Sequence, residues 1–328
     1  MTTIRKLFAE YAAMAGIWIG LVILFGVLSE YFLTTRTLGM IANQIPPLTM
    51  LAVGMTFVLI IGGIDLSVGS VMGLSGAVVG LAMVDWSWSF YFALPLAVGV
   101  GALAGLAIGS LSAGIRIPSF IVSLGMLEIA RGLAFMATDS QTKFIGERVE
   151  GLTTPIGGLG IAPAFFIAVT AVTVGQLTLG QTAFGRRILA IGANETAAHL
   201  AGIRTRIYKV IVFAISGACA GIAGVFFTSK FQSADPNAAV GMELSAIAAV
   251  VVGGTSLMGG RGSVVNSFFG VLIIATLGSG LAQIGASEPS KRVITGAVIV
   301  VAVIMDACRG RWNPFRWWKR SSSEDNNT

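Results

Sequence analysis

Four ionisable residues lie inside long apolar stretches of the sequence, where charge is rare. They are Asp65, Glu128, Arg131 and Glu243. A lone charge in hydrocarbon costs at least about 2.5 kcal/mol, so such a group usually faces a cavity, a pathway or an opposite charge. These residues therefore predict either contacts that join helices or a route for a polar solute.

Glu128 and Arg131 are three residues apart, a spacing that places two side chains on one face of a helix. We expect them to neutralise each other as a structural ion pair. The other interpretation makes Asp65, Glu128 and Glu243 relay carboxylates of an ion-coupled secondary transporter. The single histidine and the capped loop described below argue against it.

Asp65 lies in the run GGIDLSVGS, residues 62–70, where glycines interrupt one apolar stretch and a second one follows. Glycine breaks a helix readily, and Asp65 or Ser67 can cap the next helix by accepting hydrogen bonds from its first N–H groups. Two interpretations remain open: an ordinary turn between helices, or a broken helix that lines a pathway.

A polar loop over residues 181–209 contains the signals of one very short helix. Asn194 is a good N-cap, Glu195 suits the first turn, His199 falls near the end, and Gly202 suits the left-handed C-terminal position. A helix of about seven residues is too short to be stable alone, so it must dock. Its small face, which includes Ala198 and Ala201, docks either on its own bundle or in a partner protein.

The residues of common enzyme and metal sites are missing. No lysine is followed by serine or threonine, which excludes a phosphate-binding loop. One histidine cannot build a catalytic triad or a histidine-rich metal site, and Cys219 and Cys308 have no zinc or disulfide spacing. We predict a protein that is not an enzyme and binds no metal or cofactor.

Apolar helices must position these residues, because 55% of the 328 residues are hydrophobic and only 11% are charged. We predict an all-α polytopic membrane protein with about ten passes. One membrane domain covers residues 1–308, and a basic, then polar, tail covers 309–328. The stretch 243–257 is short enough to be re-entrant. The expected passes are 12–32, 45–62, 66–84, 90–113, 117–137, 161–179, 210–229, 243–257, 264–284 and 293–307.

Basic residues gather in three places: before the first pass, in the loop 181–209, and in the tail. An even number of passes puts all three on one side, which the positive-inside rule assigns to the cytoplasm. Both termini are then cytoplasmic, and the net charge of +6 needs no nucleic-acid partner. The external loops are short, so high-affinity capture of a solute falls to another protein.

Several ordered motifs resemble the permease subunits of ribose-type ABC importers, and the resemblance covers nearly the whole chain. These permeases take up ribose, xylose, arabinose, galactose and related small sugars. The motifs are AVGMT at 52–56, GIDLSVGS at 63–70, PSFIVSLG at 118–125 with Arg131-Gly132, AIGANE at 190–195, AGI at 201–203, and AIAAVVVGGTSL at 246–257 followed by Gly259-Gly260.

The resemblance implies a permease subunit in the bacterial inner membrane, with a second permease copy or paralogue. It further implies a periplasmic sugar-binding protein and a cytoplasmic ABC ATPase, often fused in tandem. The expected ATPase-coupling element is the short helix, with Gly192, Asn194, Glu195, Ala198, His199, Ala201 and Gly202. The expected pathway residues are Asp65, Ser67, Ser119, Phe120, Ser123 and Glu243.

One departure from the family pattern falls near the short stretch 243–257. The family commonly reads Glu-Leu-Asp-Ala-Ile, whereas this chain has Ser245 in place of the aspartate. The sequence does not name the sugar.

Overall fold

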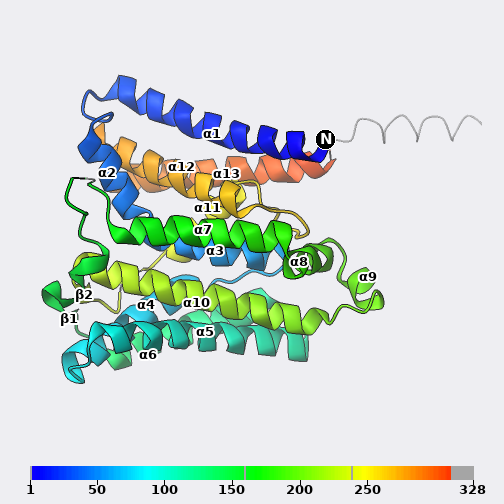
Figure 1. The fold of residues 1–328 in the computed structure, drawn as a ribbon, viewed down its shortest axis with the longest axis horizontal. Coiled ribbons are helices and arrows are strands. Elements are labelled where there is room, and N and C mark those ends of the chain that lie inside the picture. Colours follow the sequence, from blue (N-terminus) through cyan, green and yellow to red (C-terminus); the bar gives the residue numbers. More distant parts are fainter. Residues whose placement is uncertain (1, 159, 238, 312–328) are drawn as a thin grey trace, which may run out of the picture.

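A computed structural model describes residues 2–158, 160–237 and 239–311 of the chain, and nearly all of them form helices (Figure 1). The predicted tail lies outside the described residues, apart from 309–311 at the end of the last helix. The helices are α1 (Thr2–Leu28), α2 (Thr35–Gln44), α3 (Pro46–Ile60), α4 (Val68–Gly80), η1 (Leu81–Asp85), α5 (Phe90–Ile115), α6 (Ser119–Ala137), η2 (Gly146–Leu152), α7 (Pro163–Gln181), α8 (Ala183–Ala193), α9 (Glu195–Leu200), α10 (Thr205–Phe231), α11 (Met242–Val252), α12 (Val264–Gln283) and α13 (Glu288–Arg311).

Seven of the described helices are long and apolar enough to cross a membrane, or eight if the bent pair α2 and α3 counts as one span. The expected all-α polytopic architecture is therefore confirmed. The expected pass at 243–257 contains only α11, whose 11 residues are too short to cross a bilayer as a helix.

The pass predicted over 45–62 begins with a bend. α2 and α3 meet at an angle of 46°, and the two prolines Pro46 and Pro47 follow the bend directly. Proline lacks a backbone N–H and fits the first turn of a helix, so it starts α3 and ends α2.

Glycines hold α5 and α10 together, as their spacing of four residues predicts for membrane helices. On α5, Gly101 faces Gly217 of α10 and Gly105 faces the backbone carbonyl of Phe213. A Cβ on Gly101 would lie 2.3 Å from the carbonyl oxygen of Gly217, so the two backbones touch. This crossing is the most extensive helix–helix contact among the described residues.

The two ends of the bundle differ. Figure 1 shows the start of α1, the α8–α9 region and the described end of α13 at one end. At the other end, β1 (Lys143–Phe144) pairs antiparallel with β2 (Ser233–Ala234). There Lys143 Nζ lies 2.6 Å from Asp85 Oδ2, and this hydrogen bond raises the pKa of Lys143.

Candidate functional site

The break between α3 and α4 is built around the carboxylate of Asp65. Gly62 has a φ of +75°, a backbone conformation that favours glycine, and it lets the chain leave α3 abruptly. Asp65 is 1% exposed. Its Oδ1 accepts hydrogen bonds from the backbone N–H of Ser67 at 3.0 Å and from Ser67 Oγ at 2.6 Å, while Oδ2 accepts one from Ser216 Oγ of α10 at 3.3 Å.

Ser67 occupies the N-cap position of α4, but its hydroxyl bonds Asp65 and makes no side-chain bond to the helix N-terminus. Neither residue therefore caps α4 as predicted, because Asp65 accepts from the N–H of the N-cap residue and not from the first N–H groups of the helix. Both residues are buried inside the chain.

α6 closes the break from outside with two serines predicted as pathway residues. Ser119 Oγ accepts a hydrogen bond from the backbone N–H of Ile64, and Ser123 Oγ accepts one from Leu66, each at 3.0 Å. Residues 64–66 form no helix, so their N–H groups need such partners. Phe120, the residue after Ser119, is 45% exposed.

Asp65 is the best single test of whether this break is structural. We expect Asp65→Ala to lower the thermal stability and membrane level of the protein, since it leaves a buried N–H and two hydroxyls without their acceptor at a cost of about 1–3 kcal/mol. Asp65→Asn keeps one acceptor oxygen and should be milder. The measurement is thermal unfolding of the purified protein in detergent.

Ser216→Ala is the matched control, because it removes only the 3.3 Å bond to Asp65 and leaves both bonds from Ser67 in place. Its unfolding temperature should lie between those of Asp65→Asn and the parent. If Asp65→Ala unfolds at the parental temperature, the network does not stabilise the break. If Asn is as damaging as Ala, the negative charge itself is required.

Glu243 lies at the start of α11 and is buried. Its Oε1 accepts a hydrogen bond from the backbone N–H of Gly241 at 3.3 Å, whereas Oε2 has no hydrogen-bond partner among the described residues. Oε2 lies against Gly69 in the first turn of α4, where a negative charge is favoured by the helix dipole. Ser245, the departure from the family pattern, bonds the carbonyl of Gly241 at 3.2 Å.

The expected ion pair between Glu128 and Arg131 does not form. Arg131 Nη2 instead donates a hydrogen bond to Ser70 Oγ of α4 at 3.2 Å. Glu128 is exposed on α6 and has no partner within the described residues. The spacing of three residues allows the pair, but the guanidinium of Arg131 bonds the hydroxyl of Ser70 on the neighbouring helix instead.

The loop 181–209 folds into two capped helices, α8 and α9. Thr182 caps α8 by accepting from the N–H of Gly185 at 3.1 Å, and Asn194 caps α9 by accepting from the N–H of Ala197 at 2.9 Å. Gly202 has a φ of +84° and ends the second helix. The short helix predicted after Asn194 is therefore present, with six residues in regular helical conformation.

The two sides of α9 differ sharply in exposure. Ala198 is 5% exposed and packs inside the chain, so this side of α9 docks on its own bundle, one of the two alternatives predicted. Leu200 is 83% exposed, and His199 and Ala201 are exposed beside it. Leu200 is thus a large apolar side chain on the outward surface of α9. The prediction missed this residue, although its size and position were visible in the sequence.

The loop is joined to the core through three backbone segments that touch. Gly260 donates a backbone hydrogen bond to the carbonyl of Ile60 at 2.9 Å. A Cβ on Gly192 of α8 would lie 1.7 Å from that same carbonyl oxygen and 2.5 Å from the nitrogen of Gly260. We call this contact of Ile60, Gly192 and Gly260 the backbone junction. Only a residue without a side chain fits at position 192.

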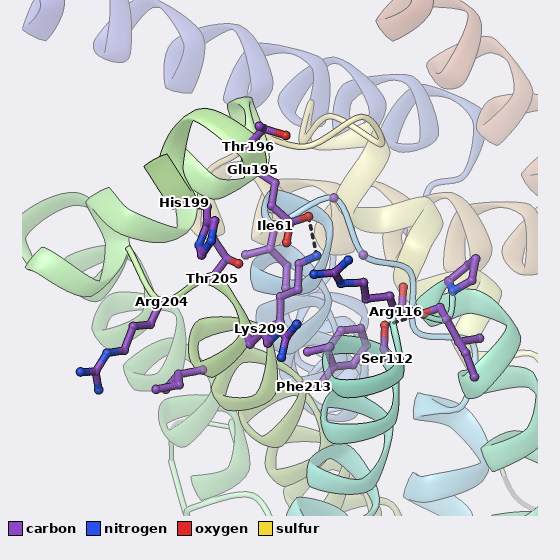
Figure 2. Close-up of a pocket in the computed structure, with 18 residues that line it drawn as sticks. Ile61, Ser112, Arg116, Glu195, Thr196, His199, Arg204, Thr205, Lys209 and Phe213 are labelled. Carbon is purple, nitrogen blue, oxygen red and sulfur yellow. Dashed lines mark hydrogen bonds and ion pairs between the residues drawn. The ribbon is translucent and has the colours of Figure 1, made fainter. Parts of the chain in front are cut away.

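A cavity of about 810 Å³ lies between this loop and the ends of α5 and α6. Its basic lining residues are Arg116, Arg204, Arg206 and Lys209. Figure 2 shows Lys209 reaching Glu195, with an Nζ to Oε2 distance of 2.6 Å, and Arg204 pointing away from them. The floor is formed by residues 61–63, so the cavity reaches the break that contains Asp65.

Within the described residues, no three histidine, cysteine, aspartate or glutamate side chains gather to hold a metal ion. The arrangement offers a fixed backbone break, a basic cavity at one end and an exposed short helix.

A family of permease components of the branched-chain amino acid transport system matches residues 37–303. The chain belongs to this family. No solved structure matches it. The family and the apolar helices together identify a multi-pass protein of the bacterial inner membrane that acts as a transport permease and not as an enzyme.

Several relatives of this chain are named as permeases for sugars. The ribose import permease of Haemophilus influenzae is 38% identical over 298 residues, which cover 88% of this chain and 91% of the relative. The D-allose transport system permease of Escherichia coli is 35% identical, and the match covers 87% of this chain and 88% of the relative. The galactofuranose transporter permease of the same species is 37% identical, and the match covers 82% of this chain and 79% of the relative. The resemblance to ribose-type permeases is thereby confirmed.

Proposed function

We propose that this chain forms the translocation pathway of a binding-protein-dependent ABC importer for a monosaccharide or a related small polyol. The observation that carries the proposal is that the relatives named for ribose, allose, arabinose and galactofuranose each align with 82% or more of this chain. Nothing among these relatives supports the ion-coupled alternative.

The exposed surface of α9 is the proposed site of coupling to the ATPase. Asn194 and Gly202 hold the two ends of this helix, and Glu195 is fixed by Lys209. Leu200, with His199 and Ala201 beside it, supplies the contact surface. Gly192 ties the helix to the core through the backbone junction.

The proposed topology has ten passes with both termini in the cytoplasm. The common position of the start of α1, the α8–α9 region and the described end of α13 supports it (Figure 1). The segment after β2 runs through α11 to Gly260, which bonds Ile60 beside α8 at the opposite end, so it supports a broken pass over a re-entrant one. Two such chains, identical or paralogous, would enclose the pathway.

The predicted pathway residues take two roles in this proposal. Phe120 lies on the exposed surface of α6 and can face a solute. Asp65, Ser67, Ser119, Ser123 and Glu243 make contacts within the chain, so we assign them the task of holding the break and α11 in place beside the pathway.

Reconstitution tests the proposal. Proteoliposomes that contain this chain, its cognate ATPase and its sugar-binding protein should take up a pentose or hexose only when ATP is supplied. The purified chain alone should hydrolyse no ATP and carry no sugar, because it lacks a phosphate-binding loop. An ATPase subunit with its catalytic glutamate changed to glutamine is the control. Uptake by the chain alone, driven by a proton gradient, would contradict the proposal.

A further inference from the structure

Glu128 lies in the middle of α6, where a charged side chain in a membrane is unfavourable unless a polar group or water lies beside it. Nine residues separate it from each end of the apolar helix Ser119–Ala137, so it lies about 13 Å from either end. A glutamate side chain is too short to reach the headgroups from there. Since Glu128 is exposed and has no partner among the described residues, its surroundings in the membrane must supply water or hydrogen-bond donors.

The surface around Glu128 is open. Gly125 and Gly132 lie one turn before and one turn after it on the same side of α6. A Cβ on either glycine would meet nothing within 4 Å, so no neighbouring side chain shields the carboxylate. The opposite side of the helix packs inside the chain through Ser123, Ala130 and Ala134. α6 therefore presents a strip with a charge at its centre and two gaps beside it.

The basic cavity lies at the start of α6. Ser119, the first residue of α6, and Pro118 before it line that cavity. α6 also lies at the edge of the bundle, where it packs mainly on α4 and α5 (Figure 1). A second copy of the chain placed against this edge would turn the strip into one wall of a passage.

We propose that the exposed strip of α6 lines the sugar pathway against a second copy of this chain, and that Glu128 is a specificity-determining residue within it. This inference rests on the proposed sugar-import function. An ionised carboxylate accepts several hydrogen bonds through its two oxygens, so it can bind two adjacent hydroxyl groups of one sugar. It repels anions, so the selected class is neutral and polyhydroxylated, and sugar acids or sugar phosphates are rejected.

Thiol accessibility tests the position of Glu128 without relying on transport. The protein is a cysteine-less chain (Cys219→Ala, Cys308→Ala) carrying Glu128→Cys, reconstituted with its ATPase and binding protein. The probe is a membrane-impermeant, positively charged methanethiosulfonate. Val174→Cys, on an exposed apolar position of the equally long helix α7, is the control. We expect Glu128→Cys to react at least about tenfold faster than Val174→Cys, and the transported sugar to slow the reaction.

Measurements of sugar uptake test the role of Glu128 in selecting the sugar. Glu128→Leu should lower uptake of the transported sugar by about tenfold or more, because it removes hydrogen bonds to a charged acceptor, whereas Glu128→Gln keeps one acceptor and should lose less. Both variants should reach the parental membrane level. Glu128→Gln should also be inhibited by the corresponding sugar acid more strongly than the parent.

Three outcomes would overturn the inference: labelling of Glu128→Cys as slow as that of Val174→Cys, labelling that the sugar does not slow, or parental uptake by Glu128→Leu. In each case sugar uptake by the parent still supports the import function, so the two proposals fail separately. Fast labelling with sugar protection, together with loss of uptake in Glu128→Leu, supports the inference.

Discussion

Gly105→Ala should prevent the chain from reaching its normal level in the membrane. A Cβ at this position would lie 2.0 Å from the carbonyl oxygen of Phe213 and 2.8 Å from its carbon, and both are backbone atoms that cannot rotate away. α5 and α10 would have to separate at the most extensive helix–helix contact among the described residues. Overpacking of this kind costs about 1–3 kcal/mol or more, and the loss of close packing removes what holds membrane helices together.

Gly99→Ala, on the same helix, is the matched control, because a Cβ there meets nothing within 4 Å. Alanine favours the helix by about 1 kcal/mol over glycine, so this variant should be as stable as the parent or slightly more so. Membrane level and the unfolding temperature in detergent are measured for both. Equal unfolding temperatures for Gly105→Ala and Gly99→Ala would show that the two helices do not touch through their backbones.

Leu200→Glu should abolish sugar uptake while leaving the permease folded. Leu200 is 83% exposed and makes no contribution to the core, so the change does not disturb packing within the chain. In the complex it would bring a charge into an apolar contact with the ATPase, where the centre of an interface is depleted of charge. Co-purification with the ATPase and ATP-driven uptake should both fall about tenfold or more.

Two other variants separate docking from folding. Leu200→Met keeps an apolar side chain of similar size and should retain association and uptake. Ala198→Trp puts bulk on the side of α9 that packs inside the chain, so it should lower the unfolding temperature itself. Full ATPase association by Leu200→Glu would mean that α9 does not dock through this surface.

Much of the fold could be predicted from hydropathy and glycine spacing. Seven of the expected passes, or eight with α2 and α3 as one span, coincide with described helices that are long and apolar enough to cross a membrane. Hydrophobic stretches of bilayer length have no other stable form there. The bend at Pro46 was less visible, since residues 35–44 before it are too polar to be predicted as part of a pass. α11 ends after 11 residues because Gly253 and Gly254 follow, and only tertiary contacts decide whether the remaining segment continues across.

The site was predicted in part. Local signals placed the cap at Asn194 and the break at Gly62 correctly, because caps and glycine conformations depend on a few adjacent residues. Partners distant in sequence could not be predicted: Arg131 bonds Ser70, and Asp65 bonds Ser216, across separate helices. Which side of a short helix faces inward, as at Ala198, likewise depends on the bundle beneath it.

The backbone junction has a consequence for how permeases of this kind can diversify. If α9 couples to the ATPase as proposed, a displacement of α8 would pass to Ile60 through main-chain atoms in direct contact, and the break begins at the next residues. This contact between backbones requires no particular side chain. Substitutions along the solute route would then change which sugar is carried without altering how the movement caused by ATP hydrolysis reaches the break.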